Sequence, residues 1–431
     1  MRELTARPRP VYVVCAETPP DVVGGLGRYA ERMMAALRHL GTPVEVFGAT
    51  ARHRAPRTER VGDVTLHRVR TPGGGRAEGR APCGDRAGGV TGAPAAVRHV
   101  ARMIGMLLFN VRVAARILRA GAGPSGSVVA VHDWMGCVAG ILCRVLARTP
   151  VVFHVHTREL NAGPARRRSA VAAGIAALET AQARMARLIV VPSVGMRDDL
   201  AACGWPADRL RVIPHGFEDP ELLRLAGLTG DEHDRLRVAV RRRYLPGGDG
   251  RLVVFAGRLS PHKGVRTLIR AAPLIAGERD DVRIVLIGAQ APRTDENAEV
   301  ARLIEQTGAG RHVIAGYRFL GSAEVFAHFL AADVCVFPST YEPFGLVAIE
   351  AMALARPVVV GPGYSPEVVG DGAVRCEHDS PEELADAVLR CLDDRPAASR
   401  LGGRGAAHVR ERYTWARTAE LTLAAYAELA R

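Results

Sequence analysis

The sequence contains a short helical segment enclosed between two runs of apolar residues. The runs 334–337 and 357–360 have the length of buried strands, and residues 346–354 have the composition of a helix. A strand, a helix and a second strand in this order predict a parallel β-α-β unit, whose carboxyl edge is where ligands bind. Glu342 follows the first strand at that edge, and Glu350 lies one to two turns into the helix.

Strand-like and helix-like segments alternate in this way through most of the 431 residues. A chain of this length exceeds the usual size of one hydrophobic core, so we expect two α/β domains, each with a parallel sheet. A polar, charged span at 218–250 predicts a linker between them. The expected strands are 11–15, 44–47, 64–69, 127–131, 151–155, 188–191 and 211–213 before this span, and 252–256, 283–287, 312–315, 334–337 and 357–360 after it.

These segments divide the chain into domains at 1–215 and 216–413. Helices at 381–394 and 398–430 are expected to close the chain, and the last helix, at about 414–431, is expected to pack back on the first domain. We expect a ligand-binding cleft between the domains.

The chain is strongly basic, with a formal net charge of +13 that is carried by arginine. Lys263 is the only lysine. A basic surface favours anionic small ligands or an acidic membrane surface, and the charge alone does not choose between them. Because the arginines are spread over the chain, we expect no nucleic-acid partner.

The cysteine pattern and the hydropathy predict a reduced, cytoplasmic protein. The cysteines form no Cys-x-x-Cys pair and have no nearby histidine at ligand spacing, so we expect no structural metal. No apolar run reaches the roughly 20 residues of a membrane-spanning helix, and the sequence shows no signal peptide. The eight cysteines are Cys15, Cys83, Cys137, Cys143, Cys203, Cys335, Cys376 and Cys391.

Two segments of the first domain carry no motif but have unusual composition. Residues 71–95 are rich in Gly, Pro and Arg without periodicity, which predicts a mobile surface loop. Residues 97–120 are long, apolar and basic. We interpret this second segment as a core helix and expect no membrane association, with a helix on a membrane surface as the alternative.

The segment 257–264, Gly-Arg-Leu-Ser-Pro-His-Lys-Gly, follows the first strand of the second domain and opens a helix. This loop places Arg258 and Lys263 beside the free amides of a helix N-terminus, which is a favourable place for an anion. A chain that uses arginine elsewhere keeps its one lysine here, where a compact, rotatable charge suits a phosphate. We therefore predict a phosphate site, although solvated charges on an ordinary turn remain the simpler alternative.

A glycine-rich turn, Gly24-Gly25-Leu26-Gly27, opens the first helix of the first domain and also offers backbone amides to an anion. Gly25, Gly27 and Ala30 fit the dinucleotide fingerprint, and Glu45 follows at a strand end. In that fingerprint, however, the glycines follow the strand directly, and here several residues intervene. An NAD site is therefore the minor alternative.

Three histidines lie at adjacent strand ends of the first domain: His132, His154 and His156. A lone histidine is usually a structural residue, but three at one sheet edge predict a lined pocket. They could also hold zinc, yet no carboxylate completes a recognisable ligand spacing.

Together these residues resemble the retaining glycosyltransferases of family 4, the group that includes glycogen synthase and sucrose synthase. The most specific match is Glu342-Pro-Phe-Gly-Leu-Val-Ala-Ile-Glu350, which resembles the E-x7-E signature of the family. The Arg258–Lys263 segment, the Gly24–Gly27 turn, His132-Asp-Trp and His154-x-His156 are similar to further motifs, in the family's order. The resemblance covers nearly the whole chain and implies the GT-B fold of two Rossmann-like domains with parallel sheets.

The resemblance implies a nucleotide-diphosphate sugar, UDP- or GDP-linked, as the donor substrate and no cofactor or metal. Arg258 and Lys263 would hold the diphosphate, aided by Gly24 and Gly25. Glu350 would accept hydrogen bonds from the ribose, and Glu342 would hold the sugar. The remaining implied contacts are Phe344, Gly345 and Leu346 to the donor, Tyr317 and Arg318 near the base, His132 facing the sugar, and His154 and His156 on the acceptor side.

One departure from the family pattern concerns the loop after the strand 357–360. The family often has Gly-Gly-x-x-Glu there, and this chain has Gly363-Tyr364-Ser-Pro-Glu367. Tyr364 in place of the second glycine could reshape the donor pocket.

The function expected from the resemblance is metal-independent, retaining hexosyl transfer to a small-molecule acceptor. The arginine- and alanine-rich composition suggests a specialised pathway such as antibiotic biosynthesis. A lipid or glucan acceptor is the first alternative, and an NAD-dependent oxidoreductase is a distant one.

Overall fold

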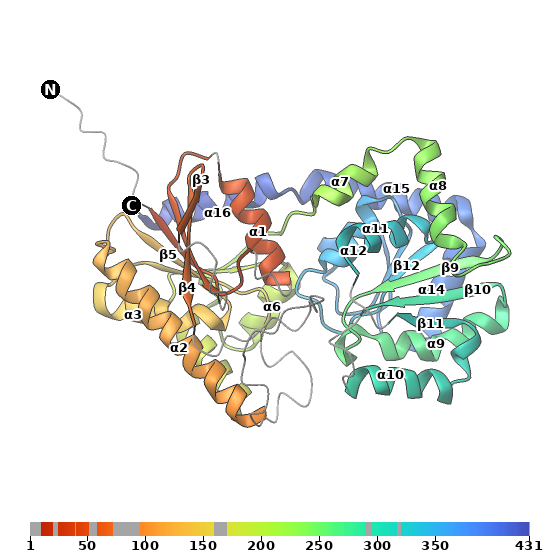
Figure 1. Ribbon diagram of the computed structural model, residues 1–431, viewed down its shortest axis with the longest axis horizontal. Helices are drawn as coiled ribbons and strands as arrows, with labels where there is room; N and C mark the ends of the chain where they lie inside the picture. Colours follow the sequence, from red (N-terminus) through yellow and green to blue (C-terminus); the bar gives the residue numbers. More distant parts are fainter. Residues whose placement is uncertain are drawn as a thin grey trace, which may run out of the picture. The chain divides into compact units, whose positions relative to one another are not determined.

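The computed structural model describes residues 10–19, 25–38, 40–50, 58–71, 95–158, 170–288, 295–316 and 320–430. The chain divides into two compact units, which are described separately below (Figure 1). Unit 1 comprises Met1–Pro192, Met196–Pro214 and Trp415–Arg431, and unit 2 comprises Ser193–Gly195 and His215–Thr414. Nearly all of the predicted loop at 71–95 lies outside the described residues, as do Gly24, Tyr317 and Arg318.

Unit 1 is built on a sheet in which the described strands follow the order β3-β4-β2-β1-β5-β6-β7-β8. All neighbours are parallel except β3 and β4, which are antiparallel. The strands are β1 (Val11–Val14), β2 (Val44–Thr50), β3 (Thr58–Val61), β4 (Val64–Arg70), β5 (Val128–His132), β6 (Val151–His154), β7 (Leu188–Val191) and β8 (Leu210–Val212).

Helices cover both faces of this sheet, as expected for a parallel sheet whose strands are valine-rich and buried (Figure 1). One core joins the sheet to α1 (Gly25–Leu37) and to the C-terminal helix α16 (Trp415–Ala430). The opposite core joins it to α2 (Ala95–Arg119), α3 (Cys137–Ala147), α5 (Ala170–Met185) and α6 (Val194–Ala202).

Unit 2 has a wholly parallel sheet in the order β11-β10-β9-β12-β13-β14. Numbered within the unit this is 3-2-1-4-5-6, the strand order of a nucleotide-binding Rossmann fold. The strands are β9 (Arg251–Ala256), β10 (Val282–Ile287), β11 (Val313–Gly316), β12 (Val334–Phe337), β13 (Val358–Val360) and β14 (Val374–Arg375).

The two faces of the unit 2 sheet form two hydrophobic cores. One core holds α9 (Val265–Glu278) and α14 (Pro381–Asp393), and α10 (Asp295–Gln306) packs beside α9. The other core holds α11 (Ser322–Ala331) and α12 (Leu346–Ala353). The short helix α13 (Pro366–Val369) and the longer α15 (Arg395–Arg412) complete the unit.

The span 218–250, predicted as a linker, instead forms two helices of unit 2, α7 (Pro220–Ala226) and α8 (Gly230–Arg241). Asp219 caps α7, and Thr229 and Glu232 form a capping box at the start of α8. These caps stabilise helices whose polar composition resembles that of a linker, because each helix buries only a narrow apolar stripe. The predicted closing helix 398–430 is also divided, between α15 and α16, near Tyr413.

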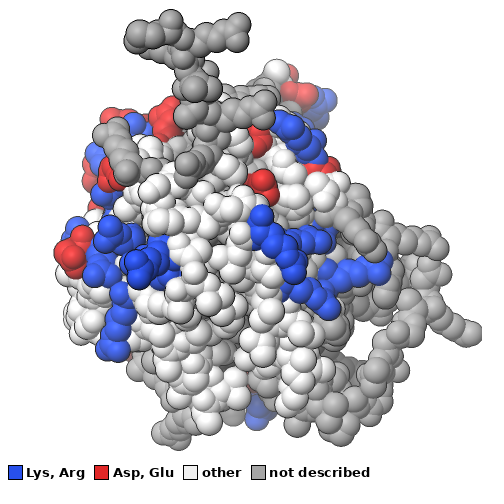
Figure 2. Space-filling view, turned by 90° about the vertical axis from the view of Figure 1, so that its left-hand side faces the viewer, with Lys and Arg blue, Asp and Glu red and all other residues white. Residues whose placement is uncertain are grey.

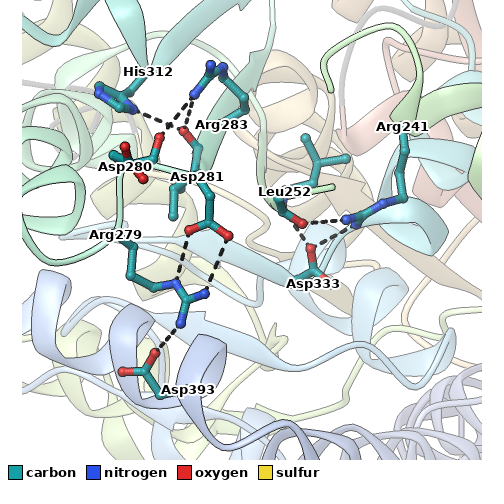
Figure 3. A network of polar contacts seen from close by, with 11 residues as sticks. Arg241, Leu252, Arg279, Asp280, Asp281, Arg283, His312, Asp333 and Asp393 are labelled. Atoms are coloured by element: carbon teal, nitrogen blue, oxygen red, sulfur yellow. Dashed lines mark hydrogen bonds and ion pairs between the residues drawn. The ribbon is translucent and has the colours of Figure 1, made fainter. Parts of the chain in front are cut away.

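A largely buried ion pair attaches α8 to the unit 2 sheet (Figure 3). The guanidinium of Arg241 donates to Asp333 Oδ2 at 2.8 Å, and the backbone N–H of Leu252 donates to the same oxygen at 2.8 Å. Both charged side chains are almost wholly shielded from solvent. Asp333 therefore accepts from a largely buried cation and from the amide of the second residue of β9. The second cluster in Figure 3 ends at Asp393, which is exposed where it meets Arg279.

Replacing Asp333 with Ala should destabilise unit 2 by about 2–4 kcal/mol, because it removes the carboxylate partner of a largely buried guanidinium and the acceptor of the Leu252 N–H. Asp393→Ala is the matched control and should cost under about 1 kcal/mol, because its ion pair is exposed. Urea unfolding followed by circular dichroism measures both. Equal losses for the two variants would contradict the role given to Asp333.

Candidate functional site

The strand order of unit 2 brings the loops after β9 and β12 to the same edge of the sheet. These two strands are neighbours, and the chain leaves them toward opposite sides, so the carboxyl ends of β9 and β12 form the switch point where parallel sheets bind ligands. The first loop carries Arg258 and Lys263, and the second carries Glu342. Topology alone therefore places the predicted phosphate loop beside the first glutamate of the E-x7-E motif.

Glycines from two loops pack against the turn that leaves β12. A Cβ at Gly264, where φ is +69°, would overlap the carbonyl of Pro338, and a Cβ at Gly361 would overlap Pro338 and Ser339. The turn is further tied to the first loop by a hydrogen bond from Thr340 N–H to the carbonyl of His262, 3.0 Å long. The loops can approach this closely only because these positions lack side chains.

The loop after β13, which contains Gly361, makes a further contact with the same turn. The N–H of Gly363 donates to the carbonyl of Ser339 at 2.9 Å, and a Cβ at Gly363 would overlap the backbone at Tyr341. Residues from the ends of three adjacent strands thus form one backbone framework. The sequence analysis did not identify Gly361 or assign a packing role to Gly363.

This framework brings Lys263 and Glu342 into direct contact. Lys263 Nζ donates to Glu342 Oε2 at 2.5 Å, and both side chains are largely buried. Ser339 Oγ donates to the same carboxylate oxygen at 3.4 Å. A partly buried cation at a ligand-binding sheet edge can exchange its carboxylate partner for a phosphate, because both are oxyanions.

Two helices begin beside this pair without side-chain caps. Helix α9 follows Gly264, and α12 follows Gly345, and neither start has a side-chain hydrogen bond at its N-cap. The first amides of a helix carry partial positive charge, so both starts favour an anion. Lys263 and the two helix starts together place positive charge at this edge of the sheet.

Glu350 and Tyr364 are two further residues near Glu342, and both are buried. Glu350, in the second turn of α12, is 5% exposed, so its carboxylate can meet a ligand over only a small part of its surface. Tyr364 is 2% exposed and hydrogen-bonds to Ser339. Burial, and next the Glu342 carboxylate, raise the pKa of Tyr364, so the hydroxyl stays protonated. A Cβ at Gly345 would overlap the Tyr364 ring, which makes glycine necessary at that position.

Arg258 and His262 complete the first loop. Arg258 is exposed. Burial, followed by the charges of Lys263 and Arg258, lowers the pKa of His262 to about 4. His262 therefore remains neutral at pH 7 and adds no charge. The sequence analysis did not single out His262.

In unit 1 the three predicted histidines form one stacked cluster. The rings of His132 and His154 stack with centroids 4.4 Å apart, and His132 Nδ1 lies 2.9 Å from His156 Nε2, so one of these two imidazoles donates to the other. His154 Nε2 is hydrogen-bonded to the hydroxyl of Tyr426 in α16, at 2.6 Å. Burial lowers the pKa of His154, and it lowers that of His156 to about 3, so both are neutral at pH 7.

Asp133 fixes the backbone around this cluster. Its backbone has a positive φ of +52° with ψ of −177°, and its carboxylate accepts from the N–H of His156 at 2.7 Å and of Thr157 at 3.3 Å. Burial raises the pKa of Asp133 to about 7, against the lowering effect of these two hydrogen bonds. A residue in this strained conformation is typical of a functional site.

Metal binding is not favoured by this geometry. His132 and His156 bond to each other and His154 bonds to a tyrosine, so their ring nitrogens do not converge on one point. Within the described residues, no group of three or more His, Cys, Asp or Glu side chains has a metal-binding arrangement.

Two family models match the chain. One, described as "Glycosyl transferase 4-like domain", matches residues 24–216, and the other, described as "Glycosyl transferases group 1", matches residues 250–394. The chain belongs to glycosyltransferase family 4. The predicted family, and the prediction of a glycosyltransferase, are confirmed.

This glycosyltransferase is similar to the alpha-maltose-1-phosphate synthase of Mycolicibacterium smegmatis, with 29% identity, covering 84% of this chain and 82% of the relative. Among solved structures, it is similar to sucrose-phosphate synthase from Thermosynechococcus elongatus, with TM-score 0.71, 22% identity and coverage of 98% and 99%. HepE from Anabaena, in complex with UDP and glucose, gives TM-score 0.67, 18% identity and coverage of 97% and 99%. These likenesses confirm the GT-B fold.

The residues predicted to contact the donor differ in their position and exposure. Lys263 and Glu342 are in contact, and Gly345 and Glu350 belong to the helix that begins beside them. Phe344 is buried beside His215 and Tyr413, so only its backbone is available to a ligand. Leu346 is partly buried in the first turn of α12, and Gly25 is exposed at the first residue of α1.

Because burial raises the pKa of the Asp133 carboxyl, we expect a pH-dependent difference in the free energy of unfolding between the glycosyltransferase and its Asp133→Asn variant. The raised folded-state pKa means that ionisation opposes folding. The wild type should therefore lose stability relative to the variant as pH rises from about 4 to about 7. Between pH 5 and pH 8 the difference should change by on the order of 2 to 3 kcal/mol in favour of Asn.

Tryptophan fluorescence during urea unfolding measures this difference, because Trp134, Trp205 and Trp415 all belong to unit 1. A stability difference that is constant with pH would show that Asp133 has an ordinary pKa.

Proposed function

We propose that this enzyme transfers a hexose from a UDP- or GDP-linked sugar to a hydroxyl of a small-molecule acceptor, with retention of configuration at the anomeric carbon. The observation that carries the proposal is the Lys263–Glu342 contact between two uncapped helix starts at the unit 2 switch point. Family membership supplies the reaction class, a nucleotide-sugar-dependent glycosyltransferase.

The donor diphosphate would bind to Lys263 and the first amides of α9 and α12, with Arg258 adding a second cation from its exposed position. Cleavage of a glycosyl phosphate leaves negative charge on the diphosphate as it departs. Fixed cations and helix amides that are present before the reaction stabilise this charge without reorganising. The UDP and glucose of the HepE complex support a UDP-linked donor here.

Glu342 would act on the sugar side of the same site. With Lys263 drawn to the diphosphate, its carboxylate could accept from sugar hydroxyls or stabilise positive charge at the anomeric carbon. Glu350 would accept from the ribose hydroxyls, since a carboxylate can accept two hydrogen bonds. In the retaining reaction proposed here, the acceptor attacks from the face that the diphosphate leaves, and the departing phosphate takes the proton. The two glutamates are then not the acid/base pair of a glycoside hydrolase.

The histidine cluster of unit 1 would serve the acceptor and the sugar. His132 and His156 remain our candidates for these contacts, as hydrogen-bonding imidazoles. His154 is 1% exposed and bonded to Tyr426, so we propose that it supports the cluster without contacting a substrate. Gly25 at the start of α1 remains a candidate for the donor, and Tyr317, Arg318 and Gly24 stay sequence predictions.

Our choice of a small-molecule acceptor rests on one relative. The chain is similar to an alpha-maltose-1-phosphate synthase, whose name refers to a small sugar phosphate. A lipid acceptor is the second candidate, and the exposed apolar face of α2 is the observation that favours it. Neither observation supports a particular pathway, so antibiotic biosynthesis is not part of the proposal.

Lys263→Ala should weaken the binding of a nucleoside diphosphate by roughly ten- to a hundred-fold, because it removes a charged hydrogen bond to phosphate. Arg258→Ala should have a smaller effect, since Arg258 is exposed. Calorimetric titration with UDP, GDP, ADP and NAD measures both variants and identifies the base.

The matched control is Arg283→Ala, a cation of the same sheet that donates to backbone carbonyls at Asp280 and Val282. It should leave binding unchanged. Unaltered affinity in both Lys263→Ala and Arg258→Ala, or binding of NAD with no binding of a nucleoside diphosphate, would overturn the proposed donor site.

A further inference from the structure

Helix α2 has apolar side chains on both of its sides, and only one side contributes to the core of unit 1. The buried side includes three residues that are 0% exposed: Phe109, Val113 and Ile117. The solvent side presents four large apolar residues that are 46–56% exposed: Val100, Ile104, Leu107 and Val111. We interpreted this segment from its sequence as a core helix, and the structure shows that this holds for one side only.

The spacing of the exposed residues makes them a continuous row. Steps of four, three and four residues return to the same face of a helix at each turn, so the row runs along three turns of α2. The neighbouring helix α3 exposes two more apolar residues near its C-terminal end, Val145 and Leu146. Scattered single apolar residues are ordinary on a surface, whereas an ordered row commonly marks a binding site.

Helix α2 and the residues that follow it as far as position 150 are basic. Residues 95–150 contain Asp133 as their single acidic residue, and that carboxylate is buried. Arg112, Arg116 and Arg119 are exposed along the C-terminal half of α2, and Arg148 is exposed just after α3. Figure 2 looks onto this side of the molecule: basic side chains form groups across a largely uncharged surface, with most acidic side chains toward the top of the view.

A second copy of the chain fits this surface poorly. A row at intervals of four and three residues can pair two helices, but stable pairs place acidic residues against basic ones along the flanks. Helix α2 has no acidic residue, so pairing two copies would bring arginines together. A nucleic acid would satisfy the arginines but would leave the apolar row in water.

We propose that α2 docks unit 1 on an anionic lipid surface, with the apolar row in the headgroup region and the flanking arginines on lipid phosphates. An exposed apolar row with basic flanks is the pattern of a helix that lies in the plane of a membrane interface. Anionic headgroups attract arginines within a Debye length, which adds to the burial of the apolar row. Of the helices that the structure describes, none is both long and apolar enough to cross a bilayer, so the contact is peripheral.

This docking surface is independent of the proposed donor chemistry. If the acceptor is a lipid, the surface would bring the enzyme to it, and if the acceptor is a small molecule, the surface would only fix where the reaction takes place. The test therefore measures lipid binding and donor binding separately.

The experiment is co-sedimentation of the full chain with vesicles of phosphatidylcholine alone or mixed with phosphatidylglycerol, at low and high salt. We expect binding to the mixed vesicles that weakens with salt, and little binding to phosphatidylcholine alone. Ile104→Gln combined with Leu107→Gln should lower the partition coefficient by roughly ten-fold or more, and Arg116→Gln combined with Arg119→Gln should do the same and reduce the salt dependence.

The matched control is Leu223→Gln combined with Val238→Gln, two residues of unit 2 that are 51% and 45% exposed. These changes should leave vesicle binding intact. Every variant is checked for its circular dichroism spectrum and its affinity for UDP, which separates a lost docking surface from a misfolded chain or a failed donor site.

Absence of binding to the mixed vesicles, or binding that the α2 variants do not reduce, would overturn the proposal. Light scattering after gel filtration tests the competing occupant. A dimer that the Ile104–Leu107 double variant converts to a monomer would assign the row to a second copy of the chain.

Discussion

Close packing of backbone on backbone at the carboxyl edge of the unit 2 sheet is the constraint on which the candidate site depends. Three loops meet at the turn after β12, and glycines at 264, 361 and 363 allow the contact because any Cβ would overlap the opposing chain. This packing holds Lys263 within 2.5 Å of Glu342. A cation and a carboxylate that come from separate loops therefore occupy fixed positions, which is what electrostatic stabilisation of a leaving group requires.

The ion pair also implies a competition. Lys263 is paired with Glu342, so in the proposed function a diphosphate would have to displace a carboxylate that is already in place. The displaced Glu342 is then available to the sugar. This exchange of partners would thus couple donor binding to the release of the Glu342 carboxylate, which would then act at the anomeric carbon. Tyr364 and Ser339, which are hydrogen-bonded to each other, would keep Glu342 in position while this occurs.

Much of this architecture could be predicted from sequence, because short valine-rich strands alternating with helices have few alternative arrangements. The positions of Glu342 and Glu350 followed from that pattern. The direct contact of Lys263 with Glu342 did not, since it depends on glycine packing between loops distant in sequence. The helices α7 and α8 were missed because their apolar stripes are narrow, although their capping residues were visible. The exposed row of α2 could not be recognised, because periodicity does not tell which of two apolar sides faces the sheet.

The most direct test of the central claim compares UDP affinity and turnover in Glu342→Gln, Lys263→Gln and Glu350→Gln. If Lys263 exchanges Glu342 for the diphosphate, Glu342→Gln should bind UDP at least as tightly as the wild type while its turnover falls. Lys263→Gln should lose UDP affinity, and Glu350→Gln should weaken donor binding more than turnover. Loss of UDP affinity in Glu342→Gln, with affinity unchanged in Lys263→Gln, would contradict the account.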